Sequence, residues 1–217
     1  MANNIAIEIE QMLERAWNKF LDYYNENAPK YRDLWECNVK ELDEKGAQKS
    51  HWICWNEYDL MFYVGRFFHD ILKEKGEEFK NIEIHFEKNV TPTNFEDYEF
   101  EDRLDKKKRP KVDMIVVREY KNDRFLLSAE AKYFHSASER YGEDPIEKIK
   151  ADIKKLETIL KSKIAQSVVF MLFDDYYWWA DKTKAGEIKE FLDKIEKDEE
   201  IIVLRSTSKR KVEAVSK

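Results

Sequence analysis

The chain has 217 residues, of which 42% are hydrophobic, 14% aromatic and 39% charged, and its formal net charge is -6. Its longest apolar run, at residues 168–173, is far short of the roughly 20 residues that a membrane helix needs, and its first residues lack the pattern of a secretory signal. We therefore expect a single cytoplasmic domain without a membrane span. Cys37 and Cys54 are 17 positions apart and form no CxxC motif or Cys/His cluster, which favours free buried thiols over a disulfide or a zinc site.

Charge is distributed unevenly along the chain. Residues 103–163 carry 17 Lys and Arg against 11 Asp and Glu, whereas residues 1–102 carry 12 against 23. Phosphate binding is driven by Lys and Arg, so this central segment is the natural place for a polyanion site. Taken alone, such asymmetry is more often a solvated surface.

Helical periodicity dominates the first third of the chain. Apolar side chains recur at helical spacing over residues 5–24, which predicts an amphipathic helix. Residues 28–50 include Pro29 and a polar stretch, and they predict a turn, a short helix and a loop. A second amphipathic helix is predicted over residues 52–75, with Gly76 placed to end it.

A strand and a long excursion are predicted next. Ile82, Ile84 and Phe86 alternate with polar side chains over residues 81–90, the period-two pattern of a half-buried strand. Residues 94–102 are acidic with interleaved aromatic side chains. This acidic segment is either a solvated loop that points away from a site or an electrostatic gate beside one.

A β-hairpin follows. Residues 112–119 and 124–132 are rich in Val, Ile, Leu and Phe, and the segment between them, residues 120–123, has the composition of a turn. An antiparallel pair of strands is therefore predicted at the centre of the chain.

The last third of the chain predicts two helices and two strands. Residues 146–161 have helical periodicity with a basic outer face, and the continuous apolar run at 166–173 is typical of a central strand covered on both faces. A helix at 184–196, a short strand at 201–204 and a basic, frayed tail at 206–217 follow. This order of elements predicts an α/β fold with a mixed central sheet flanked by helices.

Three ionisable side chains converge at one end of the predicted hairpin. Glu130 and Lys132 are two positions apart, which puts them on the same face of their strand, and pairing across the turn brings Asp113 beside them. Two close carboxylates repel each other unless a cation lies between them, and oxygen ligands suit Mg²⁺ or Mn²⁺. Such an ion would activate water for hydrolysis of a phosphodiester bond, with Lys132 positioning the water or stabilising the transition state.

These residues resemble the motif of the PD-(D/E)xK nuclease superfamily, an acidic residue at the start of one strand and Glu-x-Lys near the end of the next. The motif is matched by Asp113 and by Glu130-Ala131-Lys132, and the resemblance covers roughly residues 52–175. The literal Pro-Asp pair is missing, because Val112 precedes Asp113 and Pro110 lies further ahead. This departure weakens the resemblance and leaves the carboxylate chemistry intact.

The resemblance implies a restriction-endonuclease-like core and a Mg²⁺-dependent deoxyribonuclease, with Mn²⁺ as the alternative ion. Asp113, Glu130 and the Ala131 carbonyl would hold the metal, and Lys132 would act on water or on the phosphate. A helix before the first strand often contributes a further Glu in this superfamily, and Glu57 lies on an apolar helix face where a carboxylate needs an explanation. Glu57 is equally consistent with a first-turn residue favoured by the helix dipole.

The partner implied by the resemblance is DNA, cut by an endonuclease of the restriction, repair or phage-defence type, with a homodimer favoured for double-strand cutting. We expect a helical N-terminal extension over residues 1–50, the nuclease domain over 51–205 and a flexible basic tail over 206–217. The expected nucleic-acid contacts are the basic side chains Lys106, Lys107, Lys108, Arg109, Lys111, Lys148, Lys150, Lys154 and Lys155.

Other interpretations stay open. The same fold can serve as a non-catalytic module that binds nucleic acid or a protein partner. Glu130 and Lys132 can also form a simple salt bridge in a structural α/β protein. The aromatic run at residues 174–179 is either a base-stacking platform or, more often, a cap on the core or a dimer contact.

Overall fold

The described part of the chain is a mixed α/β fold. The computed structural model describes residues 2–36, 53–54, 56–89, 111–118, 125–134, 145–174, 185–198 and 200–207. Within these residues the chain forms four α-helices, one short 3-10 helix and a five-stranded sheet. The α/β class and the mixed sheet predicted from sequence are confirmed. None of the helices described here has the length and apolar character needed to cross a membrane.

Helices come first, three consecutive strands follow, and from the third strand onward helices and strands alternate. Their order is α1 (Ala2–Glu36), α2 (Glu57–Glu74), the 3-10 helix η2 (Glu77–Phe79), β1 (Ile82–Asn89), β2 (Lys111–Arg118), β3 (Phe125–Phe134), α3 (Pro145–Lys161), β4 (Ala165–Asp174), α4 (Ala185–Lys197) and β5 (Ile202–Thr207). The strand order in the sheet is β1-β2-β3-β4-β5. The β1–β2 and β2–β3 pairs are antiparallel, and the β3–β4 and β4–β5 pairs are parallel.

The predicted helices and strands are confirmed, but three boundaries differ. α2 begins at Glu57 and not at residue 52, and β5 continues to Thr207, into the segment predicted as a frayed tail. α1 continues to Glu36, so the turn predicted near Pro29 is wrong. Proline removes one backbone hydrogen bond, which weakens a helix without ending it when the preceding turns are anchored by burial, as α1 is. Gly76 has a φ of 82° and follows the end of α2 as predicted. The predicted hairpin turn at 120–123, the acidic segment at 94–102 and the aromatic residues 175–179 lie outside the described residues.

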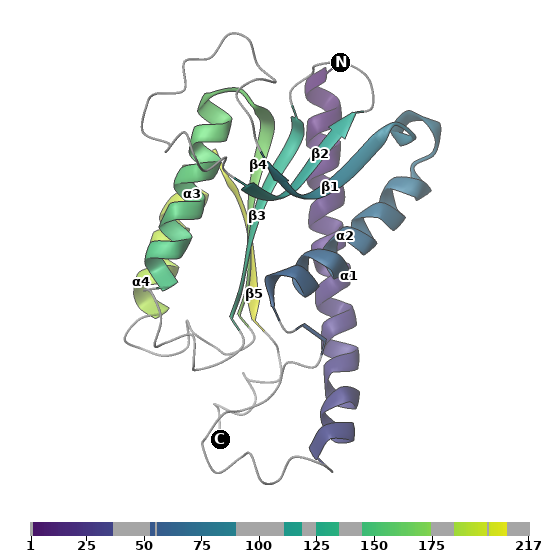
Figure 1. Cartoon of the computed structure of the whole chain (residues 1–217), viewed down its shortest axis with the longest axis vertical. Coiled ribbons are helices and arrows are strands. Elements are labelled where there is room, and N and C mark those ends of the chain that lie inside the picture. The colour runs from purple at the N-terminus through teal and green to yellow at the C-terminus, as the bar shows by residue number, and fades with distance from the viewer. Residues whose placement is uncertain are drawn as a thin grey trace.

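The sheet lies between two helical layers. In Figure 1, α1 and α2 lie on one side of the sheet and α3 and α4 on the other. The core beneath α1 and α2 is aromatic at its centre, where Phe173 contacts four rings, those of Trp17, Phe20, Tyr24 and Tyr133. The core beneath α3 and α4 is mainly aliphatic. Because α1 shares its core with α2 and the sheet, it packs as a full layer of the fold.

Candidate active site

The predicted site lies where two strands of the sheet part. Pairing between β2 and β3 ends at Met114 and Ala129. Just beyond, the N–H of Ala131 donates to the Asp113 carboxylate, with 2.8 Å between N and Oδ2. The N–H and C=O of one strand residue point to the same side, so the Ala131 carbonyl is also directed toward β2. The parting of the strands gives Asp113 access to the backbone beside Glu130.

Ion pairs join the predicted residues to α3. Lys132 Nζ lies 3.2 Å from Glu57 Oε1 and 2.8 Å from Asp152 Oδ2. Lys155 Nζ lies 2.7 Å from Glu130 Oε1 and 3.3 Å from Asp152 Oδ1. We call this set the charged cluster, and its members are Glu57, Asp113, Glu130, Lys132, Asp152 and Lys155. Four carboxylates face two ammonium groups in it, which leaves an excess of two negative charges when all six groups are ionised.

The centre of the charged cluster is withdrawn from water, whereas the Glu57 side chain at its edge is partly exposed. Glu130 is 1% exposed and Asp152 is 9% exposed. Burial, with a further contribution from the Asp113 charge, raises the pKa of Glu130 to about 8. Burial also raises the pKa of Glu57 and of Asp113 above their usual values. The cluster therefore resists carrying its full negative charge unless another cation enters it.

Both lysines of the cluster remain cationic. Burial alone would lower the pKa of Lys132, but the Glu57 and Asp152 carboxylates outweigh burial, and the pKa is raised above its usual value. The pKa of Lys155 is raised in the same way, against burial, by Glu130 and Asp152. Lys132 is thus suited to donate hydrogen bonds and to stabilise negative charge, and it is not suited to act as a general base.

The start of α2 is fixed so that Glu57 reaches the cluster. The Asn56 side chain caps the helix by accepting a hydrogen bond from the N–H of Asp59 at 3.1 Å. Two residues before this cap, the Tyr133 hydroxyl donates to the carbonyl of Cys54 at 2.8 Å. Tyr133 follows Lys132 on β3, so the strand that carries the lysine also holds the segment that leads into Glu57. Cys54 is buried and forms no disulfide within the described residues, and Cys37 lies outside them.

The cluster offers oxygen donors for a divalent cation. Within the described chain, no group of three or more His, Cys, Asp or Glu side chains has the geometry of a metal site. The available donor set is therefore two carboxylates, Asp113 and Glu130, with the Ala131 carbonyl beside them. Oxygen-only donors and an excess of negative charge fit Mg²⁺ or Mn²⁺, which retain several water ligands.

Five of the nine predicted nucleic-acid contacts lie within the described residues, and one of these five enters the charged cluster. Lys106, Lys107, Lys108 and Arg109 are outside the described residues. Lys148, Lys150 and Lys154 are exposed on α3, and Lys111 is exposed at the start of β2. Lys150 pairs with Glu147 at 2.7 Å, and Lys111 pairs with Glu87 at 3.2 Å. Among the predicted contacts that the structure describes, Lys155 is the one that points into the cluster, where it also donates to the Lys111 carbonyl at 3.0 Å.

Asp152 belongs to the cluster, and it was not among the predicted site residues. Its signal in the sequence is its position on α3, because it shares the apolar face of that helix with Ile149, Ile153 and Leu156. A carboxylate on an apolar helix face needs a partner, which is the same reasoning that singled out Glu57. Asp152 contacts both lysines and so fixes their positions relative to each other.

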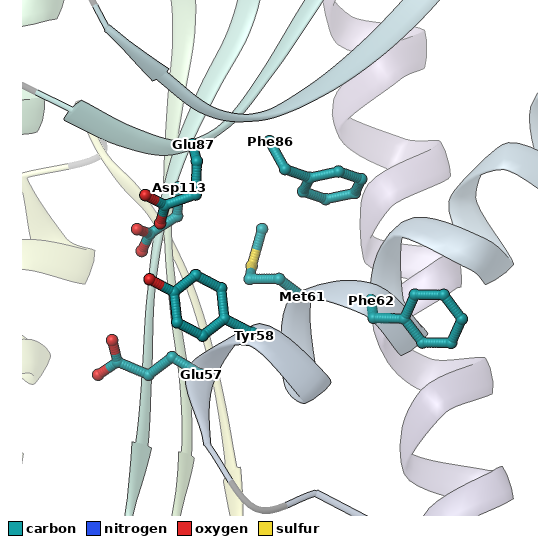
Figure 2. A pocket seen from close by; sticks show the side chains of 7 residues that line it. All are labelled: Glu57, Tyr58, Met61, Phe62, Phe86, Glu87 and Asp113. Carbon is teal, nitrogen blue, oxygen red and sulfur yellow. The ribbon is translucent and has the colours of Figure 1, made fainter.

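An open cleft of about 250 Å³ borders the cluster. It is lined by Glu57, Tyr58, Met61, Phe62, Phe86, Glu87 and Asp113. Figure 2 shows the α2 side chains on one side of this cleft and those of the strands on the other. Glu57 and Asp113 belong to both the cleft and the charged cluster, so the two features are continuous.

Comparisons of the chain with models of protein families, with curated proteins and with solved structures each give no match. The arrangement of the charged cluster within the α/β fold is therefore the ground for a functional inference.

Proposed function

We propose that this chain is a metal-dependent nuclease of the PD-(D/E)xK type that hydrolyses phosphodiester bonds, with DNA as the expected substrate. The observation that carries the proposal is the charged cluster, in which four carboxylates face two ammonium groups and provide a donor set suited to a divalent ion. Burying carboxylates without a matching cation is unfavourable, so the cluster is better explained by chemistry than by stability.

The order of the elements supports a restriction-endonuclease-like core. Asp113 lies near the start of β2 and Glu130-Ala131-Lys132 lies near the end of β3, as the superfamily motif requires. The helix before the first strand contributes Glu57, and the helix after β3 packs beside the site and contributes Asp152 and Lys155. The contact of Glu57 with Lys132 agrees with what the resemblance implies for the helix before the first strand.

Each residue of the cluster has a role in this proposal. Asp113, Glu130 and the Ala131 carbonyl would hold Mg²⁺ or Mn²⁺, which supplies Lewis acidity and an activated water. Lys132, held between Glu57 and Asp152, would donate to the water or to the phosphate and stabilise the charge that develops there. The remaining residues position the lysines.

A second candidate is a non-catalytic module of the same fold. It is favoured by one observation, that the ammonium groups of Lys132 and Lys155 each lie close to two carboxylates. Ion pairs as complete as these can hold β3 and α3 together without any metal. In that case the cluster is structural, and removing one lysine would leave buried carboxylates unpaired and destabilise the fold.

Cleavage assays distinguish the two candidates. Plasmid and single-stranded DNA are incubated with Mg²⁺, Mn²⁺ or a chelator, using wild type, Lys132→Ala and the control Lys73→Ala, which changes an exposed lysine of α2. We expect metal-dependent cutting that falls by about 100-fold or more in Lys132→Ala, because a donor to the developing charge is lost. Lys73→Ala should cut like the wild type.

Two results would reject the nuclease. Cutting that survives the chelator, or that is undiminished in Lys132→Ala, contradicts the assigned chemistry. Absence of cutting by a folded wild type, together with a large loss of stability in Lys132→Ala by urea unfolding, supports the structural module instead.

A further inference from the structure

Exposed aromatic side chains gather beside the charged cluster. Four large hydrophobic side chains are exposed in the described residues, and three of them line the open cleft. Tyr58 is 65% exposed, Phe62 is 61% exposed and Phe86 is 45% exposed. We call this feature the aromatic cleft. Exposed aromatic rings beside a site point to a ligand with a planar, apolar face.

The ring of Phe86 packs against α2 at a position where a glycine leaves room for it. A Cβ atom added to Gly65 of α2 would lie 2.3 Å from Phe86 Cζ, so the ring rests against the helix backbone at this position. Glycine inside a helix is less favourable than alanine by about 0.5–1 kcal/mol. The period-two pattern predicts that Phe86 is buried with Ile82 and Ile84, whereas its ring packs on one side and opens into the cleft on the other.

The backbone of β1 departs from a regular strand at the cleft. Glu87 has a φ of 52°, in the left-handed region that residues other than glycine rarely adopt. Successive side chains of a regular strand point to opposite faces, yet Phe86 and Glu87 both line the aromatic cleft (Figure 2). Such local strain is often found at functional sites, and here it turns two neighbouring side chains toward one cavity.

Size and charge restrict what can occupy the aromatic cleft. Its volume of about 250 Å³ is below the roughly 300–1,000 Å³ of sites that enclose a drug-sized ligand, so it suits a single ring system. Carboxylates of Glu57, Glu87 and Asp113 line it, and they would repel a phosphate group. A nucleobase meets both conditions, because its faces stack on aromatic rings and its amino groups can donate to a carboxylate.

We propose that the aromatic cleft stacks an unpaired nucleobase next to the phosphate that is cut, so that the substrates are strands with unpaired nucleotides. This inference rests on the proposed nuclease function and adds the substrate class. A base inside a duplex is stacked and paired, and it reaches such a cleft only after extrusion, at a cost of a few kcal/mol. Tyr58 and Phe62 provide the stacking surface, and Phe86 closes the cleft on the strand side.

The test compares two DNA substrates and two variants. A labelled single-stranded oligonucleotide, and the same oligonucleotide annealed to its complement, are cut in Mn²⁺ by wild type, by the double variant Tyr58→Ala/Phe62→Ala and by the control Ile7→Ala. Ile7 is the fourth exposed apolar side chain, 49% exposed and on α1. Because all three substituted side chains are exposed, the variants should stay folded, which urea unfolding verifies.

The wild type is expected to prefer the single strand. The double variant should lower kcat/KM for the single strand by about 10- to 100-fold, chiefly through KM, and so remove most of the preference for the single strand over the duplex. Ile7→Ala should match the wild type on both substrates. An oligonucleotide with 2-aminopurine beside the cut position should lose fluorescence on binding the wild type and retain it with the double variant.

Three results would overturn the aromatic cleft as a base site while the nuclease stands. They are equal cutting of duplex and single strand by the wild type, no selective loss in the double variant, and a dimer that the double variant dissociates in sedimentation. The last result would assign the cleft to an interface between copies. If the wild type cuts neither oligonucleotide with any metal, the proposed function fails, and this inference fails with it.

Discussion

The two faces of β3 are both buried, but they carry opposite kinds of side chain. On the face toward α1 and α2 lie Leu127, Ala129, Ala131 and Tyr133, all part of the aromatic core. On the face toward α3 lie Ser128, Glu130 and Lys132, of which Ser128 is 0% exposed and Glu130 is 1% exposed. One strand therefore joins an apolar core on one side to the charged cluster on the other.

The two faces of β3 therefore differ in their effect on the free energy of unfolding. Apolar burial is favourable at about 25 cal/mol per Å² of surface removed from water. A buried charge or hydroxyl is unfavourable unless it is fully paired, and Ser128 Oγ has no hydrogen-bond partner among the described residues. On β3, the side chains that face α1 and α2 therefore contribute stability, whereas Ser128, Glu130 and Lys132 on the α3 face reduce it while holding the groups that chemistry needs.

Removing a ring from the apolar face should have the largest effect on stability. Phe173 is fully buried among four other aromatic rings, so Phe173→Ala leaves a cavity that rigid neighbours cannot fill. We expect a loss of about 3–5 kcal/mol in the free energy of unfolding, measured by urea titration. Phe62→Ala makes the same chemical change at an exposed position and should stay within about 0.5 kcal/mol of wild type. Similar losses of stability in Phe173→Ala and Phe62→Ala would contradict the assignment of stability to the buried aromatic core.

A substitution on the α3 face of β3 should raise the stability of the protein instead of lowering it. The pKa of Glu130 is raised from 4.5 to about 8 in the folded state. Between these two values the folded protein keeps a proton that the unfolded chain has released, so the contribution of Glu130 to stability falls as pH rises from about 4.5 to about 8. Glutamine cannot ionise, so Glu130→Gln should be more stable than wild type by about 2–4 kcal/mol at pH 9 and nearly equal to it at pH 4.

Urea titrations of wild type and Glu130→Gln at pH 4 and pH 9 test whether the stability difference grows as pH rises. Glu14→Gln, at an exposed position on α1, is the matched control and should differ from wild type by less than about 0.5 kcal/mol at both pH values. A gain in Glu130→Gln that is the same at both pH values would show that ionisation of Glu130 is not its cause. Metal-dependent cutting should be lost in this variant, so one substitution would raise stability and remove function.

The backbone of the fold followed from local patterns in the sequence. Alternation over 81–90 and the paired apolar runs of the hairpin are set by side-chain periodicity, so β1, β2 and β3 were predicted. The neighbourhood of Asp113 and Glu130 followed from hairpin geometry. The extension of α1 beyond Pro29 did not, because a proline indicates a turn in sequence and tertiary packing decided otherwise.

Parts of the site that depend on packing between elements were not predicted. Asp152 joins the cluster only because α3 lies over β3, which no local pattern specifies. The aromatic cleft depends on the contact of Phe86 with Gly65 and on the left-handed backbone at Glu87. An exposed Phe in an otherwise regular alternation cannot be recognised before the structure shows which face is covered.

The smallest expected effect tests whether the two faces of β3 act together. Tyr133 belongs to the apolar face, but its hydroxyl holds the Cys54 carbonyl and so the start of α2, from which Glu57 reaches Lys132. Tyr133→Phe keeps the ring and should lower stability by only about 1 kcal/mol. If the hydroxyl also positions Glu57, Tyr133→Phe should lower kcat several-fold with little change in KM. The same substitution in a Glu57→Gln background should then have no further effect on kcat, because the group it positions is already altered. Equal, additive losses in both backgrounds would show that Tyr133 serves the core alone and that the two faces act independently.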